Sequence, residues 1–163
     1  MKITVFGAGY VGLVTSTCLA EMGNLVTCID INENKIKELN DLKIPIFEPG
    51  LSELITSNLN NRLFFSTDVA LNISNCDIIF LAVGTPEDEK GNPILDNLFS
   101  VANSIGKDVG KDCVIVQKST APVGTCSKVK SIVDGHLDSR QLDYNIEVVS
   151  NPEFLKEGNA VND

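Results

Sequence analysis

The stretch ITVFGAGYVG, residues 3–12, decides the fold that we expect for this chain. A short uncharged apolar run, residues 3–6, leads directly into glycines in the pattern G-x-G-x-x-G. Apolar side chains between Val11 and Met22 then recur at the period of a helix. A strand that passes through a glycine-rich turn into a helix is the opening unit of a doubly wound α/β fold.

The rest of the chain repeats this alternation of strands and helices. Further apolar runs predict strands at residues 26–29, 63–65, 78–83, 114–116 and 146–149. Helical periodicity lies between several of these runs, at residues 36–40 and 98–105. Because the strands are apolar almost throughout, they are typical of a parallel sheet that is covered on both faces. The predicted fold class is therefore α/β: a Rossmann-type, doubly wound, mainly parallel sheet with helices on both faces.

Each glycine of the motif has its own role in a dinucleotide-binding fingerprint. Gly7 permits the tight turn, Gly9 lets the backbone approach a pyrophosphate, and Gly12 allows the helix to pack closely on the strand. The amides of Tyr10, Val11 and Gly12 are expected at the helix N-terminus, where they would face the phosphates. A merely glycine-rich turn is the alternative, and the strand and helix on either side argue against it.

An acidic residue at the end of the second strand favours NAD as the cofactor. Asp30 follows Gly12 by 18 residues, where a carboxylate would accept hydrogen bonds from ribose hydroxyls. The 2′-phosphate of NADP would meet like charge there, and neither Ile31 nor Asn32 can neutralise it as an arginine would. Lys35, one helical turn further on, has two open interpretations: a second contact to the ribose, or a solvated helix lysine.

Three later segments follow strands and are expected at the carboxyl edge of the sheet, where doubly wound folds bind ligands. Gly84-Thr85-Pro86 begins a polar loop that extends to residue 97. KSTAPVGT, residues 118–125, places Ser119 or Thr120 as a helix N-cap with Pro122 in the first turn, or else offers Thr120 to a ligand. NPEFLKEG, residues 151–158, fits either proton transfer or an ordinary glutamate-rich helix start.

Composition excludes several classes of function. The chain has 163 residues, of which 43% are hydrophobic, and 13 basic side chains against 22 acidic ones give a net charge of −9. Such a surface disfavours nucleic acid and anionic membranes as partners. Glycines and hydroxyl side chains interrupt the uncharged residues 3–20, so we expect a cytoplasmic protein without a signal peptide or a membrane span.

The cysteines and the histidine give no sign of a metal site or a nucleophile. The five cysteines are odd in number and contain no C-x-x-C pair, so reduced, buried thiols are expected. Cys126 lies near a predicted helix start, and we interpret it as a packing residue rather than a reactive thiol. His136, the single histidine, lies in a polar stretch that we interpret as a surface turn without a catalytic role.

Together these segments resemble the UDP-glucose/GDP-mannose dehydrogenase family, specifically its N-terminal NAD-binding domain. The matching motifs run through the whole chain: ITVFGAGYVG (3–12), DINENKI (30–36), PIFEPGL (45–51), LAVGTP (81–86), KSTAPVGT (118–125) and NPEFLKEG (151–158). Ala121 stands where the family usually has valine. The resemblance implies an NAD-dependent, four-electron oxidation of the C6 alcohol of a nucleotide sugar to a carboxylate, through a cysteine-bound thiohemiacetal and thioester.

The resemblance also implies roles for residues of this chain. The expected NAD contacts are Val11, Asp30, Lys35, Thr85, Thr120 and, near the cofactor, Glu157. Thr120 would also help to position the catalytic water, and Glu153 would assist water or proton transfer when the thioester is hydrolysed. The expected lining of the sugar-nucleotide pocket is Glu153, Phe154, Leu155, Lys156 and Glu157. The form of this segment favours UDP-glucose as the substrate, with the GDP-mannose branch as the alternative.

In the family, the nucleophilic cysteine, a catalytic lysine and an asparagine lie in a later domain, beyond a central helix that forms the dimer. We therefore expect residues 1–163 to be a truncated NAD-binding domain that binds NAD, is monomeric and catalyses nothing alone, from a homodimeric parent that oxidises UDP-glucose. Two rival hypotheses stay open. One is a non-catalytic NAD-binding module, and the other is a different Rossmann oxidoreductase, such as a 3-hydroxyacid dehydrogenase, which has no reason to carry residues 151–158.

Overall fold

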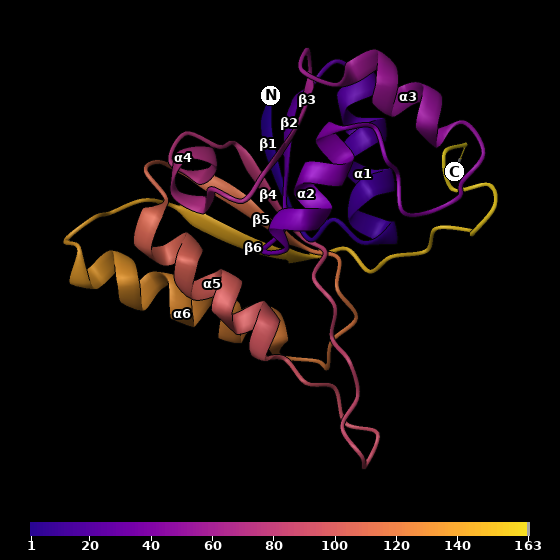
Figure 1. Ribbon diagram of the computed structural model, residues 1–163. Coiled ribbons are helices and arrows are strands. Elements are labelled where there is room, and N and C mark those ends of the chain that lie inside the picture. Colours follow the sequence, from indigo (N-terminus) through magenta and orange to yellow (C-terminus); the bar gives the residue numbers. More distant parts are fainter. Residues whose placement is uncertain (163) are drawn as a thin grey trace.

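A computed structural model describes residues 1–162, and its centre is one parallel sheet with the strand order β3-β2-β1-β4-β5-β6 (Figure 1). The strands are β1 (Lys2–Phe6), β2 (Leu25–Ile29), β3 (Leu63–Ser66), β4 (Ile78–Leu81), β5 (Cys113–Gln117) and β6 (Ile146–Ser150). Every pair of neighbouring strands is parallel. The order reverses between β1 and β4, which makes the sheet doubly wound and confirms the predicted fold class.

Helices cover the sheet on both sides. They are α1 (Tyr10–Glu21), α2 (Glu33–Asn40), α3 (Leu51–Asn58), α4 (Val69–Ile73), α5 (Asp96–Asp108) and α6 (Thr125–Ser139). Buried side chains of α1, α2 and α3 belong to one apolar core, and those of α4, α5 and α6 belong to the other. Within residues 1–162, no helix combines the length and the apolar character needed to cross a membrane.

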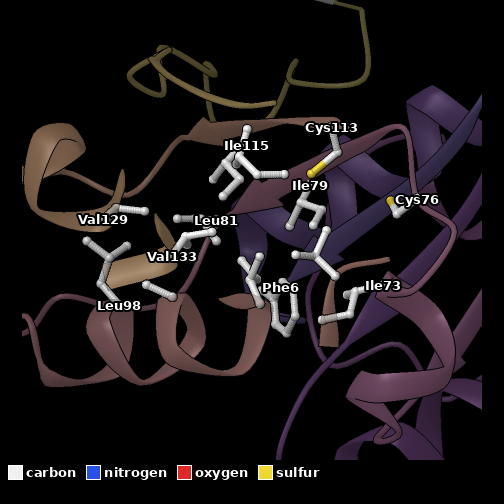
Figure 2. Close-up of a cluster of buried hydrophobic side chains, with 14 of the residues drawn as sticks. Phe6, Ile73, Cys76, Ile79, Leu81, Leu98, Cys113, Ile115, Val129 and Val133 are labelled. Atoms are coloured by element: carbon white, nitrogen blue, oxygen red, sulfur yellow. The ribbon is translucent and has the colours of Figure 1, made fainter. Parts of the chain in front are cut away.

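Successive residues of the strands enter opposite cores, which explains the continuous apolar runs. In β1, Val5 packs on the side of α1, whereas Phe6 points to the side of α5 and α6. Figure 2 shows Phe6 in this second core, with Ile79, Leu81 and Ile115 from the neighbouring strands. Because both faces are buried, apolar side chains predominate at both sets of alternate positions, and the buried Thr4 of β1 donates its hydroxyl to the carbonyl of Asn72.

The structure corrects two boundaries near the carboxyl edge. The strand predicted at residues 78–83 ends at Leu81, because its partner β1 ends at Phe6 and the chain turns at Gly7, whose φ is +100°. The helix predicted to start near Pro122 begins only at Thr125, so neither Ser119 nor Thr120 is its N-cap. That position belongs to Gly124, whose φ of +92° is in the left-handed region.

Two further predictions about local structure are wrong. His136 lies in α6 rather than in a surface turn. A Cβ added to Gly106 would lie 2.8 Å from the His136 ring, and the Nε2 of His136 lies 2.9 Å from Asn103 Oδ1. The polar residues around it form the outer face of a helix whose buried positions include Val129 and Val133. The glutamate-rich helix considered at residues 151–158 is also not formed, and this segment is irregular.

The C-terminal segment returns across the molecule after β6. Figure 1 shows residues 151–162 leaving β6 and running to the side of α3. Leu155, Ala160 and Val161 pack there into the core shared by α1 and α3. The segment thus connects the two halves of the sheet, although it contains no regular structure.

Candidate functional site

The glycines at the end of β1 differ in what surrounds them. A Cβ added to Gly7 would lie 2.4 Å from the carbonyl oxygen of Ala82, and one added to Gly12 would lie 1.7 Å from the carbonyl oxygen of Gly7. The fold itself therefore requires these two glycines. At Gly9, by contrast, an added Cβ would meet no atom within 4 Å. The open space beside Gly9 is where a ligand can approach the backbone closely.

The first turn of α1 presents free amides at this open space. Its first α-helical hydrogen bond runs from Leu13 N to Gly9 O, so the amides of Tyr10, Val11 and Gly12 precede the helical ladder. No side chain caps this end, and no acidic residue lies in the first turn. These features favour an anion such as a pyrophosphate at the helix N-terminus.

Asp30 is fixed at the end of β2 by three donors. Its carboxylate accepts hydrogen bonds from Ala8 N at 2.9 Å, Asn32 N at 3.0 Å and Lys35 Nζ at 3.0 Å. Burial works to raise the pKa of Asp30, but the two backbone amides and the lysine outweigh it and lower the pKa. Asp30 therefore remains an ionised acceptor that is oriented by the glycine loop itself.

A pocket of about 320 Å³ lies between these groups and α5. Gly9, Asp30 and Lys35 line one side, and Val83 and Gly84 at the end of β4 line another. The wall from α5 carries the polar side chains of Asn97, Ser100 and Ser104 together with the apolar Val101. An apolar pocket with a few polar groups at the switch point of the sheet fits a nucleoside.

The structure brings together the threonines that were expected to contact the cofactor. Thr85 follows β4, and its hydroxyl donates a hydrogen bond of 2.8 Å to the carbonyl of Thr120, which follows β5. The neighbouring Ser119 donates its hydroxyl to the carbonyls of Leu81 at 3.1 Å and Val83 at 2.7 Å. The loops after β4 and β5 are therefore tied to each other at the switch point.

The segment after β6 adjoins the loop after β5. The backbone amide of Asn151 donates to the backbone carbonyl of Gln117 at 2.9 Å. The side-chain oxygen of Asn151 accepts a hydrogen bond from Lys118 Nζ at 3.2 Å. Burial lowers the pKa of Lys118, and the nearby carboxylate of Glu153 opposes this shift. The Glu153 carboxylate itself accepts a hydrogen bond from Leu155 N. Lys118 is a cation at this edge that the sequence analysis did not assign.

The side chains of residues 153–157 point in different directions. Phe154 is 86% exposed, whereas Leu155 packs on the core beside α1. Lys156 and Glu157 are exposed, and Glu153 is half-buried. Leu155 also lines a separate apolar cavity of about 490 Å³ between α1 and α3, which includes none of the glycine-loop residues. The sugar-nucleotide pocket expected from the sequence would therefore have to form from the exposed side of this segment.

Several contributors to the site were not assigned from the sequence. The Ala8 amide orients Asp30, and α5 supplies the polar wall of the pocket. The recurrence of Asn97, Ser100 and Ser104 on one helical face was a usable signal for that wall. Glu48, within the PIFEPGL motif, is buried and accepts a hydrogen bond from Tyr10, and no local pattern identifies such a long-range contact. Among residues 1–162, no cluster of three or more acidic, cysteine or histidine side chains is placed to hold a metal ion.

Comparison with known proteins gives a consistent result over the whole chain. The model of the UDP-glucose/GDP-mannose dehydrogenase family, NAD binding domain, matches residues 1–163. UDP-glucose 6-dehydrogenase TuaD of Bacillus subtilis is 49% identical over 163 residues, which are 99% of this chain and 35% of that protein. UDP-glucose 6-dehydrogenase of Pseudomonas aeruginosa is 42% identical over 164 residues, covering 100% of this chain and 36% of the relative.

Solved structures agree with these relatives. A ternary complex of GDP-mannose dehydrogenase from Pseudomonas aeruginosa superposes with a TM-score of 0.90 at 32% identity, over 99% of this chain and 38% of that one. A UDP-glucose dehydrogenase from Pyrobaculum islandicum superposes with a TM-score of 0.87 at 32% identity, over 98% of this chain and 37% of that one. The chain thus spans little more than a third of the length of the proteins it matches.

Proposed function

The chain belongs to the UDP-glucose/GDP-mannose dehydrogenase family, and we propose that it supplies the NAD-binding half of an enzyme that oxidises UDP-glucose to UDP-glucuronate. The match to the family's NAD-binding domain carries the cofactor part of this proposal. The substrate part is supported by the relatives named UDP-glucose 6-dehydrogenase, which are 49% and 42% identical to this chain.

The residues present fit NAD. We propose that the open face of Gly9 and the amides of Tyr10, Val11 and Gly12 hold the pyrophosphate. Asp30 would accept hydrogen bonds from the adenosine ribose, within the pocket of about 320 Å³. The 2′-phosphate of NADP would bring like charge to Asp30 and compete with it for Lys35, so NAD is favoured.

The later segments are proposed to serve the reaction. Bound NAD supplies the hydride acceptor for the oxidation. Thr85 and Thr120, which are hydrogen-bonded to each other, would contact the nicotinamide half of the cofactor. Thr120 would also help to place the attacking water, while Glu153 would move its proton. Residues 153–157 would contact the nucleotide sugar, with Glu157 also close to NAD.

The nucleophilic cysteine of the proposed reaction is not expected among residues 1–163. Burial raises the pKa of Cys28 and of Cys113 to about 12, and it also raises the pKa of Cys18 and Cys76. Such thiols are poor nucleophiles, because the thiolate is the reactive form. The thiol of Cys126 lies 3.4 Å from the side-chain oxygen of Gln117, near the start of α6, and we interpret this cysteine as a packing residue. We propose that residues 1–163 form an NAD-binding domain that is inactive alone.

The remaining proposals concern the surroundings of the protein. We propose a cytoplasmic enzyme whose complete form is a homodimer, with the chain itself monomeric. The GDP-mannose branch is a second candidate for the substrate, since a dehydrogenase of that branch superposes with a TM-score of 0.90. The UDP-glucose dehydrogenase from Pyrobaculum islandicum is also 32% identical, and the two UDP-glucose 6-dehydrogenases at 49% and 42% identity favour UDP-glucose.

Calorimetric titration of the chain with NAD and NADP tests the cofactor proposal. We expect NAD to bind with a measurable heat and NADP to bind at least about tenfold more weakly, because a charged contact is worth roughly this factor. Equal affinity for NAD and NADP, or no binding of either, would contradict the proposed cofactor site. Incubation with NAD and either UDP-glucose or GDP-mannose should give no NADH absorbance, and any turnover would show that the chain is catalytic by itself.

A further inference from the structure

Glu48 is a buried carboxylate in the irregular loop between α2 and α3. Glu48 is only 4% exposed, although the adjacent Phe47 is 90% exposed. The loop therefore turns a charge inward and an aromatic ring outward, against the usual preference of both side chains. A carboxylate is buried at high cost unless donors compensate for its lost water. The contacts of Glu48 identify those donors.

Three donors from two distant parts of the chain converge on Glu48. Its Oε2 accepts from the hydroxyl of Tyr10 at 2.6 Å and from Gly158 N at 2.8 Å, while Oε1 accepts from Ala160 N at 2.8 Å. Tyr10 is 38 residues before Glu48, and Gly158 and Ala160 are 110 and 112 residues after it. The hydrogen bond from Tyr10 is the largest influence on the pKa of Glu48 and lowers it. Burial opposes this shift, but the backbone amides of Gly158, Ala160 and Val161 add to the lowering, so the carboxylate stays ionised.

Glu48 joins the N-terminus of α1, which is proposed to bind NAD, to the C-terminal segment, which is proposed to contact the nucleotide sugar. Tyr10 is the first residue of α1 and directly follows Gly9, at the expected pyrophosphate site. Gly158 and Ala160 end the segment that carries Glu153 and Glu157. We propose that Glu48 is a positioning residue, which holds the segment of residues 151–161 in register with the N-terminus of α1. This inference rests on the proposed function for the role of that segment.

The alternative is that Glu48 only stabilises the fold. The two roles differ in where the effect of a substitution appears. The segment begins at Asn151, which is tied to Gln117, and ends where Ala160 packs near α3. Because it has no helix or strand of its own, its order depends on such isolated anchors. Loss of a positioning contact should therefore loosen this segment alone, whereas loss of general stability should affect the sheet as well.

Amide hydrogen exchange of the chain tests the proposal with Glu48→Gln. Glutamine replaces one accepting oxygen by an NH₂ group, which cannot accept from the backbone amides. Glutamine keeps one accepting oxygen, and the two amides bond to different oxygens of Glu48. We therefore expect exchange to become about tenfold faster or more at whichever of Gly158 and Ala160 loses its acceptor, as for loss of a hydrogen bond to a charged group. Amides in β1 and β4 should keep their exchange rates, and the midpoint of denaturation should change little. The matched control is Glu53→Gln, on the exposed face of α3, which should change none of these.

Tyr10→Phe provides a second variant, because it removes one donor and leaves both amides on an ionised carboxylate. It should accelerate exchange at the same two positions by a smaller factor than Glu48→Gln does. In turnover assays of the complete enzyme, Glu48→Gln should raise KM for UDP-glucose several-fold and KM for NAD by a smaller factor. Unchanged exchange at Gly158 and Ala160, or equal acceleration in β1, would overturn the positioning role. Failure of the wild-type chain to bind NAD would instead count against the proposed function and leave the exchange result intact.

Discussion

The ammonium of Lys35 lies 3.0 Å from the carboxylate of Asp30, in a pair that joins the end of β2 to α2. The same oxygen of Asp30 accepts the Ala8 amide, and the other oxygen accepts the amide of Asn32. Asp30 is therefore an anchor of the glycine loop as well as a candidate ribose ligand. Lys35 bonds to this anchor, and it thereby also lies at the edge of the pocket beside Gly9.

Replacement of Asp30 by alanine should weaken NAD binding about tenfold or more, as expected when a charged hydrogen-bond acceptor is removed. The same change frees the Ala8 amide, so part of the loss would come from a less ordered glycine loop. Calorimetry with NAD measures the effect. Asp41→Ala, at the C-terminal end of α2, is a matched control that should bind NAD like the wild type. Equal affinity of Asp30→Ala and Asp41→Ala would remove Asp30 from the cofactor site.

The glycines of the loop should respond to alanine in opposite ways. Gly9→Ala meets open space and has a φ of −81°, so it should cost about 1 kcal/mol or less in stability. Its methyl group would nevertheless stand where the pyrophosphate has to approach, and NAD binding should be lost. Gly12→Ala would collide with the carbonyl of Gly7 and should destabilise the fold by about 3 kcal/mol or more.

Denaturant unfolding and NAD calorimetry on both variants separate these effects. The expected pattern is a stable Gly9→Ala protein without NAD binding and an unstable Gly12→Ala protein. A Gly9→Ala protein that binds NAD as well as the wild type would show that the open space is not the pyrophosphate site. A Gly12→Ala protein of normal stability would contradict the close approach of α1 to the turn.

The parts of the fold that could be predicted are those with a short-range signal. The strand at residues 3–6 and the glycines after it form one local pattern, and Asp30 ends the next strand at the expected distance. His136 was misplaced because polar neighbours concealed the buried helical positions Val129 and Val133. Glu48 had no local signal at all, since its partners are 38 and 110 or more residues away. Long-range contacts of this kind follow from the assembled fold and not from a sequence window.

Thr85→Val tests whether the loops after β4 and β5 act together. It removes the hydroxyl that donates to the Thr120 carbonyl at 2.8 Å but keeps the branched shape of the side chain. We expect a loss of stability of about 1 kcal/mol, together with several-fold weaker NAD binding. Thr56→Val is the matched control, because Thr56 also donates its hydroxyl to a carbonyl at 2.8 Å, that of Ser52 in α3. If both variants bind NAD equally, the hydroxyl of Thr85 has no part in the cofactor site.

The phenol of Tyr10 should titrate in the folded protein only at strongly alkaline pH. Burial, then the hydrogen bond and the charge of Glu48, raise the pKa of Tyr10 to about 12, against about 10 for an ordinary tyrosine. Since the folded-state pKa is the higher one, the stability from this contact is complete below about pH 10 and is lost as the pH rises toward 12. The chain has two tyrosines and no tryptophan, so tyrosinate absorbance follows the ionisation cleanly. Tyr10→Phe should remove a step near pH 12 from the folded protein and a step near pH 10 from the protein in denaturant. If Tyr10→Phe removes a step at the same pH from the folded and the denatured protein, the hydrogen bond between Tyr10 and the Glu48 carboxylate is not formed in solution.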